Sequence, residues 1–207
     1  MTYNIITVGV GGQGLMLLSN IIGQACAEMH LNIKTAETHG LAQRSGSIST
    51  HVRIGKNVLS PLIPYGEADV MVSMEAMEAL RHCEYIADEG MIIINEFIWH
   101  PVQSTFTRVQ SRGKTPYVTF NEIRDLLFTI TPHVHVIDCQ ELAKKTGNPL
   151  TTNTILLGAL ARIKGFPIRI DTLKQVISRV VPSSTLDSNI HALQLGYDEL
   201  GRLIKEH

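Results

Sequence analysis

The chain has 207 residues, of which 44% are hydrophobic and 18% are charged. These proportions are typical of a folded globular protein and exclude an intrinsically disordered chain, which would be poorer in apolar residues. The formal net charge is −1, so no overall positive field attracts nucleic-acid phosphates or an anionic membrane surface. We expect one domain spanning residues 1–207 and no nucleic-acid partner.

Location and redox chemistry follow from two further features. The apolar stretches are much shorter than the roughly 20 residues needed to cross a bilayer, and the N-terminus does not have the pattern of a signal peptide. A soluble, cytoplasmic protein with no membrane contact is therefore expected. Cys26, Cys83 and Cys139 form no C-x-x-C pair, so the sequence predicts three small buried apolar residues and no metal or iron–sulfur site within this chain.

The N-terminal segment has the pattern of a strand, a glycine turn and a helix. A β-branched run over 4–10 leads into the glycine-rich turn, and Leu15, Leu18 and Ile22 then recur at helical spacing. Residues 33–37 have the pattern of a second strand. Residues 47–54 and 58–63, separated by Gly55-Lys56-Asn57, are typical of an antiparallel hairpin.

The rest of the chain alternates between strand and helix patterns before ending in helices. Strands are predicted over 68–72, 91–95 and 133–138, helices over 73–81 and 120–130, and C-terminal helices over 154–163, 172–181 and 189–204. This order predicts an α/β fold with a Rossmann-like, mostly parallel sheet, an antiparallel hairpin and a helical C-terminal layer.

Several polar residues have structural interpretations at this level. Ser73, Asn153 and Asn189 stand where helices begin and are expected to be N-caps. Glu75 and Glu78 lie near a helix start and are interpreted as complementing the helix dipole rather than as a catalytic pair. His51 and Arg53 share one strand face, which we expect to meet solvent or a partner. These interpretations assign no chemistry to the residues.

The glycine turn has two interpretations. Gly9, Gly11 and Gly14 match G-x-G-x-x-G between a strand and a helix, where backbone N–H groups and the helix dipole favour an anion. Glu37, 23 residues beyond Gly14, stands near the position of a ribose-binding acid. NAD binding is one interpretation, and a tight turn that needs glycine only for its geometry is the other.

The segment from Glu37 to Ser47 combines carboxylate, imidazole, amide and guanidinium groups in a loop interrupted by glycine. Arg44 could bind a carboxylate or phosphate with two hydrogen bonds, Gln43 could orient a polar group, and His39 could exchange a proton. The alternative is a surface or subunit-contact loop whose polar groups pair with one another, and for His39 alone we prefer it.

Several linked motifs resemble the gamma-type domain of 2-oxoacid ferredoxin oxidoreductases, and most of all the beta subunit of the indolepyruvate enzymes. The similarity extends over nearly the whole chain. One departure is Arg44-Ser45-Gly46, where the family commonly has Arg-Gly-Gly. The matching motifs are Gly9-Val10-Gly11-Gly12-Gln13-Gly14, Glu37-Thr38-His39-Gly40-x-Ala42-Gln43-Arg44-x-Gly46, His51-Val52-Arg53-x-Gly55, Ser60-Pro61, Ala68-Asp69, Asn153 with Leu157-Gly158-Ala159, and Asn189 with Gly196-Tyr197.

This resemblance implies a small subunit of a complex that oxidatively decarboxylates aryl pyruvates such as indolepyruvate to acyl-CoA and reduces ferredoxin. It implies a large partner subunit that carries thiamine diphosphate and iron–sulfur clusters, with coenzyme A bound in the complex and no cofactor held by this chain alone. No catalytic residue and no metal ligand are assigned to the chain. The candidate cofactor-binding residues are Gly9, Gly11, Gly12, Gln13, Gly14, Glu37, His39, Gln43 and Arg44.

Two other functional classes are open at the level of sequence. An independent NAD- or flavin-dependent oxidoreductase would use Gly9, Gly11, Gly14 and Glu37 as its dinucleotide site, but it needs a catalytic set that the spacing does not supply. A non-enzymatic scaffold subunit would leave the glycine turn without a ligand. A homo-oligomer of the isolated chain is compatible with all three classes.

Overall fold

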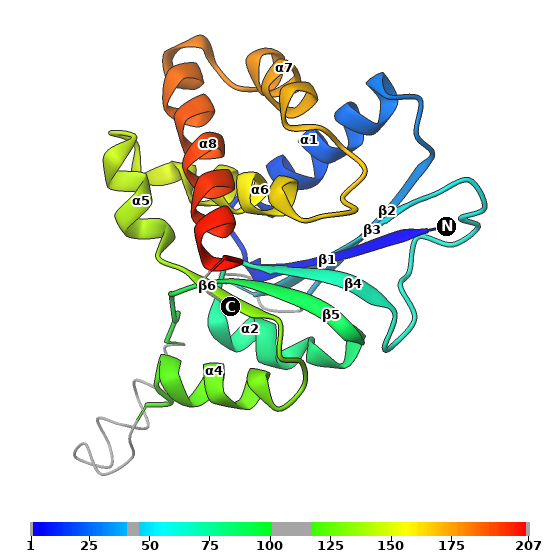
Figure 1. Cartoon of the computed structure of the whole chain (residues 1–207), viewed down its shortest axis with the longest axis vertical. Helices are drawn as coiled ribbons and strands as arrows, with labels where there is room; N and C mark the ends of the chain where they lie inside the picture. The colour runs from blue at the N-terminus through cyan, green and yellow to red at the C-terminus, as the bar shows by residue number, and fades with distance from the viewer. Residues whose placement is uncertain (1, 41–45, 101–116, 206–207) are drawn as a thin grey trace.

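The structure is a computed structural model that describes residues 2–40, 46–100 and 117–205. Its centre is one six-stranded sheet with the strand order β2-β3-β1-β4-β5-β6 (Figure 1). β1, β4, β5 and β6 run parallel to one another, while β3 pairs antiparallel with both β1 and β2. The strands are β1 (Tyr3–Val10), β2 (Ile33–His39), β3 (Ser47–Ile54), β4 (Ala68–Ser73), β5 (Ile86–Asn95) and β6 (Val134–Ile137).

Helices cover both faces of this sheet, giving three layers (Figure 1). The larger core lies under α1 (Leu15–Glu28), α5 (Cys139–Lys145), α6 (Thr152–Arg162), α7 (Ile170–Val180) and α8 (Leu186–Leu203). The smaller core lies on the other face, under α2 (Ala76–Arg81) and α4 (Phe120–Phe128). The expected α/β architecture, with its mostly parallel sheet and helical C-terminal layer, is confirmed.

β1 shows why the central strands are apolar on both faces. Ile5 belongs to the core under α1, whereas Ile6 and Val8 belong to the core under α2. A strand that is covered on both sides must be apolar at successive positions, because its side chains point alternately to the two faces.

The expected hairpin is wrong in its second strand. β3 pairs with β2 and β1, and residues 58–63 form a loop instead. Pro61 has no backbone N–H to donate to a strand ladder, and the carbonyls of Ser60 and Leu62 accept hydrogen bonds from the Arg53 guanidinium at 3.2 and 3.0 Å. The antiparallel part of the sheet is therefore β3 with its two neighbours, β1 and β2, and not the pair of segments 47–54 and 58–63.

The interpretation of His51 and Arg53 as an open strand face is also wrong. His51 is buried, and its Nδ1 accepts a hydrogen bond from the Ile63 N–H at 3.2 Å. Its ring packs edge-on against Tyr85, with 5.0 Å between ring centroids. The loop at 55–67 thus covers this part of β3, and both side chains hold the loop in place.

Three expected N-caps are wrong as well. Ser73 is the last residue of β4, and the N-cap of α2 is Glu75, whose carboxylate accepts the Glu78 N–H at 2.9 Å. Asn153 and Asn189 lie one and three residues inside α6 and α8, where both are buried. Their side chains make long-range contacts instead of closing helix ends.

The helices after β1 and β4 lie on opposite faces of the sheet, α1 on one and α2 on the other (Figure 1). In open α/β sheets, such a switch point leaves a crevice at the carboxyl ends of the two strands, where ligands commonly bind. This fold therefore places a candidate site between the ends of β1 and β4. No helix in the described parts of the chain is long and apolar enough to span a membrane.

Candidate functional site at the carboxyl edge of the sheet

The glycine turn joins β1 to α1 at this edge. Gly14 is the N-cap of α1 and has φ +80°, while Gly12 has φ +95°. Both values lie in the left-handed region, which side chains with a Cβ rarely adopt. The Gly11 N–H donates to the Gly46 carbonyl at 3.0 Å, so the turn is attached to the residue that precedes β3.

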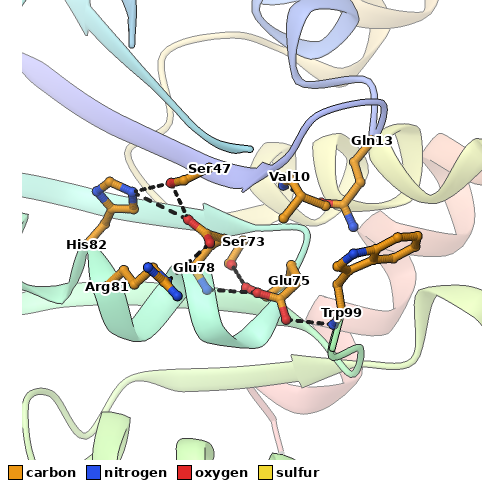
Figure 2. A network of polar contacts seen from close by, with 9 residues as sticks. All are labelled: Val10, Gln13, Ser47, Ser73, Glu75, Glu78, Arg81, His82 and Trp99. Atoms are coloured by element: carbon orange, nitrogen blue, oxygen red, sulfur yellow. Dashed lines mark hydrogen bonds and ion pairs between the residues drawn. The ribbon is translucent and has the colours of Figure 1, made fainter. Parts of the chain in front are cut away.

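Gln13 folds back over the end of β1. Its Oε1 accepts the Val10 N–H at 2.9 Å (Figure 2), and a Cβ at Gly9 would lie 2.6 Å from that oxygen and 3.0 Å from the Cβ of Met74. The missing Cβ of Gly9 therefore allows this close approach, whereas Gly12 and Gly14 are needed for their positive φ angles. The Gln13 Nε2 has no hydrogen-bond acceptor among the described residues, which leaves it available to a ligand.

Asn153 supports the turn from the helical layer. Its Nδ2 donates to the Gly14 carbonyl at 3.3 Å, and a Cβ at Gly14 would lie 2.5 Å from the same nitrogen. The Asn153 Oδ1 accepts the Thr154 N–H, and the Thr154 hydroxyl donates to Asn189 at 2.7 Å. These bonds connect α1, α6 and α8, so both asparagines position the turn rather than cap helices.

Glu37 lies in the same small hollow as the turn. This hollow has a volume of about 260 Å³ and is lined by Glu37, Ile48 and the turn from Val10 to Met16. Glu37 reaches it from β2 across the intervening β3, and the Gly40 N–H bond to the Ser47 carbonyl, 2.8 Å long, keeps the ends of β2 and β3 together. The predicted proximity of Glu37 to the glycine turn is thus present.

The hollow does not fit a dinucleotide site of the Rossmann type. In that fold the acid follows a strand that is parallel to and directly beside the first strand, whereas here the antiparallel β3 separates β2 from β1. The volume is also below the 300–1,000 Å³ that small-molecule pockets commonly have. These features favour a site that holds only one group of a ligand. The surface of another protein would then complete the site.

Several backbone donors at the turn are free to meet such a group. The N–H groups of Gly12, Gly14, Leu15, Met16 and Leu17 have no acceptor among the described residues; the first bond of the helical ladder here is from the Leu18 N–H to the Gly14 carbonyl, at 3.1 Å. The first turn of α1 contains no acidic residue. Unpaired N–H groups and the positive end of the helix dipole favour an anionic group at this position.

The remaining candidates from the sequence are distributed as follows. His39 is largely exposed at the end of β2, with its Nε2 3.5 Å from Glu37 Oε1. The role of His39 therefore stays a prediction. Gln43 and Arg44 lie outside the described residues, so their roles stay predictions.

On the other side of the crevice, Glu75 organises the segment after β5. It is only 1% exposed, and it accepts the Glu78 N–H at 2.9 Å and the Trp99 N–H at 2.8 Å (Figure 2). Burial raises the pKa of this carboxyl group above its ordinary value, and the two N–H bonds oppose the rise. The sequence indicated the helix start but not the long-range bond to Trp99.

Glu78 joins α2 to β3. Its carboxylate accepts a hydrogen bond from the Ser47 hydroxyl and lies 3.4 Å from Arg81 Nε and 3.7 Å from His82 Nε2 (Figure 2). Burial alone would raise the pKa of Glu78, but the hydrogen bonds from His82 and Ser47 and the charge of Arg81 lower it below its ordinary value. This buried anion is therefore paired, and it holds the start of β3 beside α2.

Ser47, His82 and Glu78 contain the side-chain types of a hydrolytic triad, but their geometry differs from one. The Ser47 hydroxyl lies 3.3 Å from His82 Nε2, and the Glu78 carboxylate faces the same nitrogen. In a triad the carboxylate binds the opposite ring nitrogen, which frees Nε2 to take the serine proton. We therefore assign this cluster a structural role.

No group of three or more His, Cys, Asp or Glu side chains within the described ranges is arranged to hold a metal ion. The groups that converge at the carboxyl edge are instead backbone N–H donors, the amide of Gln13 and the carboxylate of Glu37. The N–H groups and the Gln13 amide can bind a polar or anionic group, whereas the Glu37 carboxylate can accept a hydrogen bond from a donor on the same ligand. They do not supply a nucleophile or a metal.

Comparison with known proteins agrees with this geometry. The model of the pyruvate ferredoxin/flavodoxin oxidoreductase family matches residues 4–199. The chain belongs to this family. It is 39% identical over 199 residues to the indolepyruvate oxidoreductase subunit IorB of Archaeoglobus fulgidus, with 96% of each chain covered. The predicted resemblance to the gamma-type domain of 2-oxoacid ferredoxin oxidoreductases is confirmed.

Solved structures share the fold at lower identity. The gamma subunit of a keto/oxoacid ferredoxin oxidoreductase from Geobacter sulfurreducens superposes with a TM-score of 0.70 at 17% identity, covering 98% of both chains. A 2-oxoglutarate:ferredoxin oxidoreductase chain from Magnetococcus marinus, solved with 2-oxoglutarate, coenzyme A and succinyl-CoA, has a TM-score of 0.69 at 19% identity; the match covers 97% of the present chain and 31% of that one. The same fold therefore occurs both as a separate subunit and as part of a longer chain.

Proposed function

We propose that this chain is the small subunit of an indolepyruvate ferredoxin oxidoreductase and that its glycine-turn hollow completes the coenzyme A environment at the entrance of the active site. The substrate assignment is supported by the full-length similarity to IorB subunits, which are 36–39% identical over 94–96% of this chain. The independent NAD- or flavin-dependent oxidoreductase is not supported by these comparisons.

The observation that supports the role of the hollow is its set of N–H donors without an acceptor among the described residues. Coenzyme A has phosphate groups, and free N–H groups at a helix start are a general solution for binding phosphate. The hollow, about 260 Å³ in volume, fits one such group but not the whole molecule. The rest of the coenzyme would contact the large subunit, on which thiamine diphosphate and iron–sulfur clusters supply the decarboxylation and electron-transfer chemistry.

A pair of variants at Gly12 tests this role. A Cβ at Gly12 would meet no atom within 4 Å, and Asp and Asn are the residues that best tolerate a positive φ after glycine. Gly12→Asp and Gly12→Asn have nearly the same shape and differ in charge. We expect the carboxylate to raise the KM for coenzyme A about tenfold or more relative to the amide, because it repels the phosphate.

The measurement uses the complex of both subunits and compares kcat and the KM values for coenzyme A and indolepyruvate. Complex formation and the KM for indolepyruvate should be equal for the two variants. Equal KM values for coenzyme A would show that no anionic group of the coenzyme lies at the turn. If the wild-type chain copurifies with no partner containing thiamine diphosphate and iron–sulfur clusters, the subunit assignment itself is wrong.

A further inference from the structure

A second candidate binding surface lies at the edge of the sheet opposite the glycine turn. The loop at 55–67 joins the end of β3 to the start of β4, and it exposes three large side chains: Leu59 is 94% exposed, Leu62 55% and Tyr65 67%. We call these three residues the apolar loop surface. Exposed apolar side chains that are grouped in this way are characteristic of interaction sites.

This loop is held in one conformation by contacts on its inner side. Val58 and Ile63 are buried, and the Arg53 and His51 side chains bind the backbone at Ser60, Leu62 and Ile63. A loop that is already ordered loses little conformational entropy when a partner binds.

The far end of the loop is fixed in the same way. The Tyr65 ring lies against Tyr85, with 4.8 Å between centroids, and the Gly66 N–H donates to the Glu84 carbonyl at 2.9 Å. The exposure of the three apolar side chains is therefore a property of an ordered segment.

Acidic residues border the apolar loop surface. Glu67, Glu84 and Asp88 are exposed, and their carboxylates have no hydrogen bond or ion pair with another described residue. They are close to the loop, because Glu67 follows Gly66, Glu84 binds Gly66 through its carbonyl, and Asp88 lies on β5 beside the start of β4. Two cations lie at the loop, Lys56 and the Arg53 guanidinium, which binds the carbonyls of Ser60 and Leu62, so the three carboxylates outnumber them.

The negative charge of this border indicates which kind of partner can bind the apolar loop surface. In a two-fold symmetric dimer, the surface would meet its own copy, and the acidic borders would face each other. Like charges across an interface disfavour such a contact, whereas a basic border on a different protein favours it. The occupant that fits is therefore a different polypeptide with an apolar centre and Lys or Arg residues around it.

We infer that the apolar loop surface, bordered by Glu67, Glu84 and Asp88, docks onto such a basic-bordered patch of the large subunit of the complex. The inference rests on the proposed function, since it takes the large subunit as the partner. It adds a second contact region, on the edge of the sheet opposite the coenzyme A hollow. The small subunit is then held at the amino ends of its parallel strands, and the glycine turn remains accessible to ligand.

Truncation of the apolar side chains is the first test. The double variant Leu59→Ser/Leu62→Ser changes two exposed side chains, so its thermal stability should stay close to that of the wild type. We expect its affinity for the large subunit, measured by biolayer interferometry, to fall about tenfold or more. The matched control is Leu150→Ser, because Leu150 is 83% exposed in the turn before α6; it should bind as the wild type does.

Charge reversal is the second test. Glu84→Lys/Asp88→Lys should slow association with the large subunit at low ionic strength, and the difference should vanish near 1 M salt, where the Debye length is about 3 Å. The double reversal Asp187→Lys/Asp198→Lys at two exposed positions of α8 changes the net charge by the same amount and is the control. An association rate that is equal for the two reversals at low salt would overturn the electrostatic part of the inference.

The outcomes separate this inference from the proposed function. A wild-type complex with thiamine diphosphate and iron–sulfur clusters, together with unchanged affinity of the Leu59→Ser/Leu62→Ser variant, would overturn the docking surface and leave the function intact. Dimerisation of the isolated small subunit that is abolished by the same variant would show that a second copy is the occupant, and would also overturn it. Absence of a cofactor-containing partner would contradict the proposed function.

Discussion

At the scale of single residues, hydrogen bonds between side chains and backbone decide which groups remain available for a ligand. The Gln13 oxygen takes the Val10 N–H, which leaves the Gln13 nitrogen available. Glu75 takes the Trp99 N–H and so attaches the segment after β5 to the start of α2. The second bond does not follow from the sequence, because it joins groups 24 residues apart whose proximity depends on how β4, α2 and β5 are placed.

His51 shows how burial changes a residue that the sequence suggests is exposed. Its Nδ1 must be unprotonated to accept the Ile63 N–H. Burial, and in second place the nearby charge of His82, lower the pKa of His51. The folded state therefore favours the neutral ring, so this contribution to stability is complete above the unfolded-state pKa of about 6.5 and is lost as the pH falls toward the folded-state value.

We predict that His51→Asn makes the free energy of unfolding less dependent on pH. The Asn oxygen can still accept the Ile63 N–H but does not titrate. The loss of stability between pH 8 and pH 5, measured by urea unfolding, should be smaller than in the wild type. At pH 8 the variant should be about 1 kcal/mol less stable, because the ring contact with Tyr85 is lost. The exposed His191→Asn is the control, and an equal pH dependence for His51→Asn and wild type would contradict the prediction.

At the scale of elements, the close crossing of α6 and α8 depends on glycine. A Cβ at Gly196 would lie 1.8 Å from the Ile155 carbonyl oxygen, and one at Gly158 would lie 2.0 Å from the Leu193 carbonyl oxygen. This crossing brings Thr154 within hydrogen-bond distance of Asn189, and Asn153 on the same helix binds the glycine turn. The C-terminal layer thus supports the candidate site through backbone contact between its helices.

Alanine substitutions at two helical glycines should have opposite effects on stability. Gly196→Ala should lower the free energy of unfolding by about 2–3 kcal/mol, because the new methyl group meets backbone that must move. Gly23→Ala should raise it by about 0.5–1 kcal/mol, because a Cβ at Gly23 in α1 meets no atom within 4 Å and Ala favours the helix. Urea unfolding measures both, and a neutral Gly196→Ala would contradict the close crossing.

At the scale of the whole molecule, the sheet separates the two proposed sites. Its carboxyl edge carries the glycine turn and free donors, and its amino edge carries the apolar loop surface. The two cores on either side of the sheet share its strands, which is the arrangement expected of a single domain. Burial places Cys26 and Cys139 in the core under α1, and it leaves Cys83 half-buried beside α2.

Thiol labelling tests whether residues 1–207 unfold as one domain. Burial raises the pKa of Cys26 to about 11 and raises that of Cys139 well above its ordinary value, so neither thiol should react in the native protein. We expect iodoacetamide to modify Cys83 first and then Cys26 and Cys139 at equal rates, as followed by peptide mass spectrometry. Much faster labelling of Cys139 than of Cys26 would indicate that the C-terminal layer opens independently.

The sequence by itself determined most of the order of strands and helices, the glycine turn and the family, because periodicity and turn residues are local properties of the chain. Glu37 does lie beside the turn, although the Rossmann spacing that suggested this assumes that β2 is next to β1. The sequence did not determine that β3 lies between β1 and β2 or that residues 58–63 form a loop, because strand pairing depends on contacts far apart in the chain.

Only the tertiary structure decided which polar residues became buried and which donors stayed free. Asparagine is a residue type that is common at N-caps. Because α6 and α8 cross closely, Asn153 instead binds the glycine turn, and Asn189 holds Thr154 beside it. His51 and Arg53 alternate as an exposed strand face would, but the loop at 55–67 covers them. The burial of a residue depends on which segments pack against it, and these segments are distant from it in the sequence.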